Sequence, residues 1–203
     1  MPELPDDPER FTRAWNALSP QQKDAEYQQN PFIGNHPGMP FDDRTMCNER
    51  HLGELTRETQ ADVNAMQARY DQLARQQYMG DHSAAVGSEL AALGPKLQAA
   101  KHSLDEYRGV QNAMKAPPGT PKRYLGLLDD EGQGAVSIGN PDTAIRNAIL
   151  VPGTGDDLTN MTGNTNRAAA MYDAAMQANP NLHAGDVSVT AWLGYDRPMS
   201  VVD

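Results

Sequence analysis

Apolar side chains recur at intervals of three and four residues over two long stretches of the chain, which is the spacing of one helix face. In the first stretch they are Leu52, Leu55, Val63, Met66, Tyr70 and Leu73. In the second they are Val86, Leu90, Leu93, Leu97, Ala100, Leu104, Tyr107 and Met114. The pattern predicts an antiparallel helical hairpin over residues 44–116, with the narrow apolar stripe that is typical of a coiled coil.

Polar and helix-breaking residues predict where these helices begin and bend. Asp42 or Asp43 is expected to cap the first helix of the hairpin, and Ser83 is expected to cap the second. Gly94-Pro95 lies inside the second helix. Proline lacks the N–H that the helix needs, so we expect a kink there, or two separate helices.

The first part of the chain, residues 1–43, is rich in proline and is expected to be irregular with short helices. One helix is predicted over Pro8–Leu18, with Phe11, Trp15 and Leu18 on one face. Ser19-Pro20 predicts the start of another helix, because serine caps well and proline is tolerated at the first helical position. We expect Trp15 to pack against a neighbouring domain and not to bind a ligand.

The pattern changes after a Pro-rich linker at residues 117–122. Short apolar or alternating runs predict strands at residues 123–128, 135–139, 148–151 and 187–193. The continuous apolar run Ala148–Val151 predicts a strand buried on both faces. A helix capped by Thr159 or Asn164 precedes the last strand and is expected to direct inward Ala168, Met171, Tyr172, Ala175 and Met176. Residues 123–203 therefore predict an α/β domain with a mixed sheet of about four strands.

Composition excludes several classes of function. The 203 residues carry a net charge of -10 with a pI near 4.9 and no basic cluster, which argues against nucleic-acid binding. The single cysteine, Cys47, rules out an internal disulfide and is expected to be incidental rather than nucleophilic. No segment resembles a signal peptide or a membrane span, so we expect a cytoplasmic protein.

The Gly-rich turn Pro152–Asp156 follows the third predicted strand and precedes a helix. This arrangement is typical of a loop whose backbone N–H groups stabilise an anion. The same residues also fit an ordinary strand-to-helix turn without a ligand. A nucleotide-phosphate loop is disfavoured, because Leu158 stands where the third glycine of the dinucleotide motif belongs and no Gly-Lys-Ser/Thr is present. Residues 129–134 lack the spacing of a calcium loop and predict a hairpin turn.

Four motifs combine these elements into a recognisable pattern: Arg123-Tyr124-Leu125, Gly139-Asn140-Pro141-Asp142-Thr143-Ala144, Val151-Pro152-Gly153-Thr154-Gly155 and Ala191-Trp192-Leu193-Gly194-Tyr195-Asp196. Together they resemble a family of poorly characterised α/β-hydrolase-like proteins of actinobacteria. The upstream segments Trp15-Asn16-Ala17-Leu18-Ser19-Pro20 and Ile33-Gly34-Asn35 also resemble the region that precedes the hydrolase domain there. The resemblance implies an incomplete α/β-hydrolase-like sheet behind an N-terminal helical hairpin.

The resemblance also implies site residues. The N–H of Thr154 would be the first oxyanion donor, Gly153 and Gly155 would let a substrate approach, and Asp156 would brace the loop. No G-x-S-x-G nucleophile motif is present, and no serine stands on a predicted strand-to-helix turn. The five histidines are expected to be solvated, with no spacing that marks a base or a metal ligand. We therefore expect no catalytic residue, metal ligand or cofactor in this chain, and whether it is an enzyme stays open.

The order of strands in such a sheet, 1-2-4-3-5, leaves Ala148–Val151 unpaired when the fifth strand is missing. A bare apolar edge is a liability, so we expect the hairpin, a second copy or a partner protein to cover it, or the domain to continue on residues beyond Asp203. Two hypotheses follow. The chain is the N-terminal part of a serine esterase-like hydrolase that is inactive alone, or it is an interaction module that uses the hairpin and the sheet edge.

Overall fold

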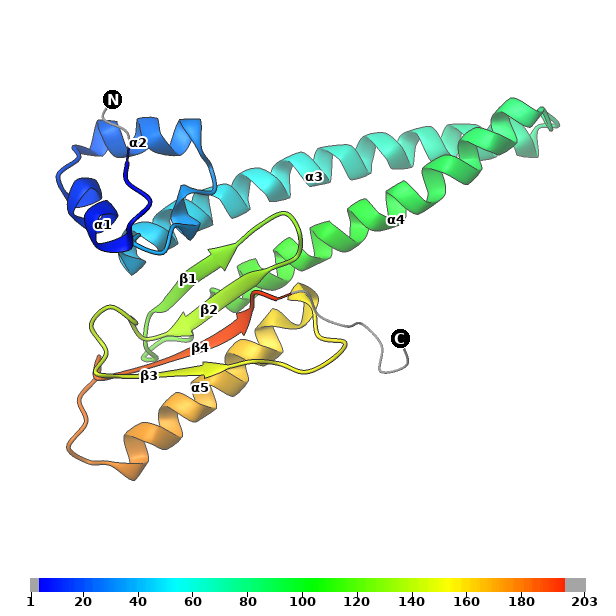
Figure 1. Ribbon diagram of the computed structural model, residues 1–203. Helices are drawn as coiled ribbons and strands as arrows, with labels where there is room; N and C mark the ends of the chain where they lie inside the picture. The colour runs from blue at the N-terminus through cyan, green and yellow to red at the C-terminus, as the bar shows by residue number, and fades with distance from the viewer. Residues whose placement is uncertain (1–3, 196–203) are drawn as a thin grey trace.

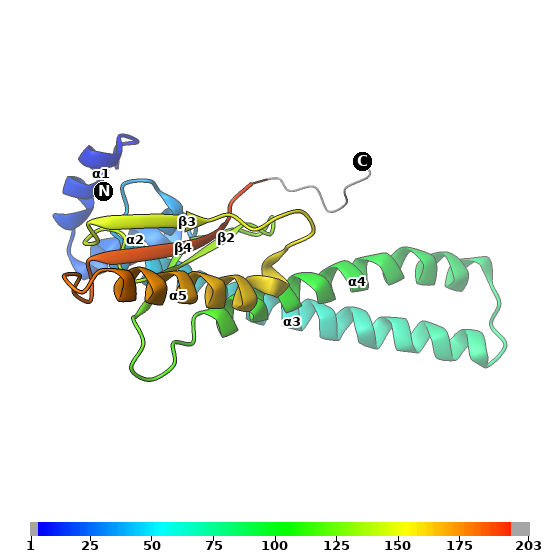
Figure 2. The same ribbon diagram turned by 90° about the horizontal axis from the view of Figure 1, so that it is seen from below.

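The computed structural model describes residues 4–195 as a long helical hairpin beside a small mixed sheet (Figure 1). Two short helices precede the hairpin, and a further helix lies along one face of the sheet (Figure 2). The helices are α1 (Pro8–Asn16), α2 (Pro20–Gln29), α3 (Phe41–Tyr78), α4 (Ala84–Ala113) and α5 (Met161–Ala178), with 3-10 turns η1 (Ile33–Asn35) and η2 (Leu158–Asn160). The strands are β1 (Arg123–Leu128), β2 (Gly134–Ile138), β3 (Arg146–Leu150) and β4 (Val187–Leu193).

The two N-terminal helices begin where their sequence signals predict. Ser19 and Gln22 form a reciprocal capping box at the start of α2, which satisfies two N–H groups at the helix end. Trp15 is completely buried beside Phe11, and its indole N–H donates to Asp43 at 2.7 Å. The packing of Trp15 within the protein is therefore confirmed. It attaches the first two helices to the start of α3.

Each side of the hairpin is a single continuous helix, α3 on one side and α4 on the other. Ser83 caps α4 as predicted, but the predicted caps of α3 are wrong, because that helix begins at Phe41 and places Asp42 and Asp43 inside its first turn. Their charges still favour the positive end of the helix dipole. Of the two alternatives at Gly94-Pro95, the division into two helices is wrong, since α4 runs through Pro95 as one helix. Val63, Leu97 and Leu104 form a buried cluster between the two helices, so this stripe is used within the hairpin.

The four strands form one sheet in the order β1-β2-β4-β3. The pairs β1–β2 and β2–β4 are antiparallel, whereas β4 and β3 run parallel. Residues 129–133 connect β1 to β2 as a hairpin, and Gly132 has a positive φ there. The predicted fold class, a helical hairpin followed by a mixed sheet of about four strands, is confirmed.

One hydrophobic core joins the base of the hairpin to the sheet. Tyr107 and Val110 of α4 and Leu52 of α3 meet inward-facing residues of the strands and of α5 in this core. Ala168 and Tyr172 point inward from α5 as predicted, but Met171 is exposed, because it lies outside the buried stripe of that helix. The predicted caps Thr159 and Asn164 are wrong as well. The chain first forms η2, so that the α-helix begins at Met161.

The structure contradicts the prediction that the third strand is buried on both faces. Among the described residues, β3 is the outermost strand and pairs only with β4, and Ile149 at its centre is 66% exposed. Ile145 and Val151, which flank the strand, are exposed too. An apolar run predicts a fully buried strand only when other elements cover both faces of the sheet, and here the face that carries Ile149 is exposed. The expectation of an unpaired sheet edge agrees with this arrangement.

His51 of α3 corrects the expectation that every histidine is solvated. Its ring is 7% exposed and packs edge-on against Phe32, with ring centroids 4.5 Å apart. Among residues 4–195, neither ring nitrogen has a hydrogen-bond partner. Nδ1 lies 3.8 Å from a carboxylate oxygen of Glu54, which is beyond hydrogen-bond distance. Burial therefore lowers the pKa of His51 below 6.5, and the neutral ring is the folded form.

Lowering the pH from 7.5 to 5.5 should decrease the free energy of unfolding through His51. The unfolded chain protonates this histidine near pH 6.5, whereas the folded chain resists protonation, so the stabilisation is complete above that pH and is lost as the pH falls toward the folded pKa. Urea denaturation at the two pH values measures the difference. His51→Gln should reduce it, and His82→Gln, which changes an exposed histidine, should not. An equal pH dependence in wild type and His51→Gln would contradict the assignment.

Candidate functional site

The predicted oxyanion loop lies at the end of β3, beside the open edge of the sheet (Figure 1). The side chain of Thr154 and both flanking glycines are exposed, and the turn at Thr154-Gly155 places Gly155 at a φ of 82°. Only glycine adopts that backbone readily. Within residues 4–195, no acceptor receives the N–H of Thr154. The loop therefore presents a backbone donor to its surroundings.

Three contacts hold this loop. The Tyr195 hydroxyl donates to the carbonyl of Pro152 at 2.7 Å. The Asp156 carboxylate lies 3.3 Å from a guanidinium nitrogen of Arg167 on α5, and the Asp156 N–H donates to the Gly153 carbonyl at 3.4 Å. These contacts anchor both ends of the loop to the sheet and to α5, which limits its freedom between them.

None of the described side chains at this loop has the chemistry of an activated nucleophile. Ser137 and Ser188 lie inside strands. The Ser137 hydroxyl is hydrogen-bonded to the Thr190 hydroxyl at 2.6 Å, and the Ser188 hydroxyl donates to the Gly139 carbonyl at 3.3 Å. Cys47 is remote on α3, and burial raises the pKa of its thiol to about 11, which disfavours the reactive thiolate. The fourth resembling motif ends at Asp196, which lies outside the described residues together with the rest of the C-terminus.

The structure brings together three potential metal ligands that the sequence pattern did not single out. His102 and Glu106 lie four residues apart on α4, and Asp157 closes the Gly-rich loop. His102 Nε2 is 3.5 Å from Asp157 Oδ2 and 3.9 Å from Glu106 Oε1, and all three ligand atoms lie within 4.8 Å of one another. The helical spacing of the first two was visible in the sequence, but the third residue joins them only through the packing of α4 on η2.

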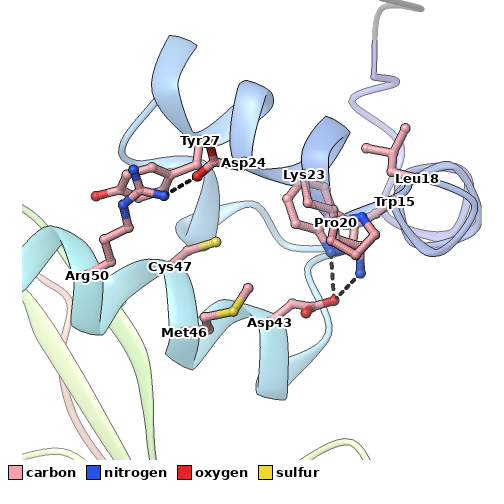
Figure 3. A pocket seen from close by; sticks show the side chains of 10 residues that line it. All are labelled: Trp15, Leu18, Pro20, Lys23, Asp24, Tyr27, Asp43, Met46, Cys47 and Arg50. Atoms are coloured by element: carbon pink, nitrogen blue, oxygen red, sulfur yellow. Dashed lines mark hydrogen bonds and ion pairs between the residues drawn. The ribbon is translucent and has the colours of Figure 1, made fainter.

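A separate cavity of about 480 Å³ lies between α2 and α3, near Trp15 (Figure 3). Its size suits a small ligand. Its charged groups, however, already bind each other: Arg50 pairs with Asp24, and Lys23 pairs with Asp43 at 2.8 Å. The arrangement holds α2 on α3, and it offers no unpaired charge to a ligand among these side chains.

Residues 129–203 match the sequence model of an alpha/beta hydrolase family. The match begins in the β1–β2 turn and includes the remaining strands, the Gly-rich loop and α5. It does not include the helical hairpin.

The chain is also similar to two uncharacterized proteins of Mycobacterium tuberculosis, MT2140 from strain CDC 1551 / Oshkosh and Rv2079 from strain ATCC 25618 / H37Rv. Each is 29% identical over 200 residues, which cover 94% of this chain and 28% of the relative. No solved structure matches the chain. These similarities confirm the resemblance to an actinobacterial α/β-hydrolase-like family. Among residues 4–195, no helix is long and apolar enough to cross a membrane.

Proposed function

We propose that this chain forms the N-terminal part of a serine esterase-like α/β hydrolase and supplies one donor of its oxyanion hole, the N–H of Thr154. The single observation that carries the proposal is the position of this N–H. It lies at the end of an exposed parallel strand, where the next parallel strand of such a sheet would bring the nucleophile. The strand order β1-β2-β4-β3 supports this reading, because the open side of β3 is the place for a fifth strand.

The nucleophile would come from outside the described residues. The chain spans 28% of the length of the curated relatives that it matches, so a segment that completes the sheet has room in proteins of this kind. An added strand would pair with the open backbone edge of β3, and an element packed on the sheet face would cover Ile149, whose exposure is otherwise unfavourable. The helical hairpin would then stand beside the completed sheet as an accessory element.

A protein-interaction module is the second candidate function. The exposed edge of β3 favours it, because an unpaired strand can bind a strand of another chain. Tyr78 and Met79 at the tip of the hairpin are also almost fully exposed. The apolar stripe of the hairpin gives less support to an interaction module, since Leu97 and Leu104 of that stripe are already buried between α3 and α4.

The purified 203-residue chain should not hydrolyse a short p-nitrophenyl ester faster than buffer, because residues 4–195 hold a donor but no activated nucleophile. Initial rates at pH 7 to 8 measure this. Hydrolysis that disappears on replacing one of its serines would overturn the proposal.

Reading the natural coding DNA past codon 203 provides the positive test, in which an in-frame G-x-S-x-G between a strand and a helix is expected. A stop codon there would favour the interaction module.

A further inference from the structure

We propose that His102, Glu106 and Asp157 form a binding site for a divalent transition-metal ion, with Zn²⁺ as the best match. The site lies where α4 packs against η2, and it includes the residue that ends the Gly-rich loop. It is independent of the proposed hydrolase function, because binding requires only these three side chains.

The distances between the ligand atoms suit a small metal ion. Zn²⁺ binds nitrogen and oxygen at about 2.0–2.2 Å, so its ligands stand roughly 3.3 Å apart in a tetrahedral site. His102 Nε2 is already 3.5 Å from Asp157 Oδ2 and 3.9 Å from Glu106 Oε1. Small side-chain rotations close these gaps. Three protein ligands leave the fourth position to a water molecule or another ligand.

The charges also favour a cation. Glu106 and Asp157 are each 8% exposed, and their carboxylates face one imidazole. Two carboxylates supply negative charge that attracts a divalent ion, and carboxylate and imidazole groups both serve as ligands of Zn²⁺. The imidazole ligand favours Zn²⁺ over Mg²⁺ and Ca²⁺, which prefer oxygen ligands alone.

The surrounding contacts orient the ligands before an ion binds. Asp157 Oδ1 accepts from the N–H of Thr159 at 2.9 Å and from its hydroxyl, which leaves Oδ2 directed at His102. His102 and Glu106 share one face of a continuous helix, so their backbones are fixed. Such orientation of ligating side chains by outer contacts is a common property of metal sites. The bound ion would cross-link α4 to the end of the Gly-rich loop.

Isothermal titration of the metal-free chain with Zn²⁺ tests the proposal. We expect about one ion per chain, and saturating Zn²⁺ should raise Tm by about 5 °C or more. His102→Gln and Glu106→Gln should each weaken binding at least about tenfold. His102 is half-exposed, so its variant should fold normally, with an unchanged Tm in EDTA. His183→Gln is the matched control, because this exposed histidine also lies 3.5 Å from a single aspartate, Asp186.

The absence of saturable Zn²⁺ binding to the wild-type chain would overturn the proposal. Wild-type affinity in both His102→Gln and Glu106→Gln would also overturn it, because the ion would then lie elsewhere. A loss of affinity in His183→Gln equal to that in His102→Gln would likewise indicate non-specific binding to surface histidines. Titration with Mg²⁺ and Ca²⁺ should give weaker binding, and a preference for either would contradict the assigned ion class.

Discussion

Replacing Gly109 with alanine should lower the free energy of unfolding by about 2–3 kcal/mol. Gly109 lies on α4 where the helix meets η2, and a Cβ there would stand 2.2 Å from the carbonyl oxygen of Leu158. The next nearest atoms, the Leu158 carbonyl carbon and the Thr159 Cα at 3.1 Å, also belong to the backbone. Because no flexible side chain can move aside, α4 and η2 must separate. Urea denaturation measures the loss.

The matched control for this prediction lies on the same helix. A Cβ at Gly87 would meet nothing within 4 Å, so Gly87→Ala should stabilise the protein by about 0.5–1 kcal/mol through helix propensity alone. The two variants should therefore differ by roughly 3 kcal/mol although the chemical change is the same. Equal stability of Gly109→Ala and Gly87→Ala would show that α4 does not approach η2 so closely.

Replacing Thr154 with proline should lower kcat for ester hydrolysis about 10²–10³-fold in the complete hydrolase that we propose. Proline has no backbone N–H, so the substitution removes the proposed oxyanion donor while leaving the rest of the loop sequence unchanged. An oxyanion forms only in the transition state, so the loss should appear in kcat more than in KM. Steady-state kinetics with a short p-nitrophenyl ester measure both constants.

Thr154→Ala separates the backbone from the side chain in this experiment. Alanine keeps the N–H, and the Thr154 side chain is exposed, so this variant should retain most of the activity. Thermal denaturation should show similar stability for both variants, because the loop is held by Tyr195 and by Asp156 on either side of the substitution. An equal loss of kcat in the two variants would contradict a role for the backbone donor.

Local signals determined most of the secondary structure. The three- and four-residue spacing of apolar side chains predicted both long helices, and Ser19 and Ser83 marked helix starts because a cap bonds only to its own first turn. The runs at residues 123–128 and 187–193 matched β1 and β4. Errors arose where a longer-range contact decided the outcome. Asp43 bonds Trp15 and Lys23 instead of capping α3, and η2 delays the start of α5.

For the candidate site, too, local sequence signals predicted some features and long-range packing decided the others. The sequence by itself determined the Gly-rich loop after β3, because glycine spacing between a strand and a helix is a local property. The family resemblance predicted the open edge at β3, whereas only the tertiary structure decided that Ile149 on this strand is exposed, since the exposure of a strand face depends on which elements pack against it. The tertiary structure also decided that His51 is buried and that His102, Glu106 and Asp157 converge. A histidine has no local signature of its partners, which are set by the packing of helices and turns distant in the chain.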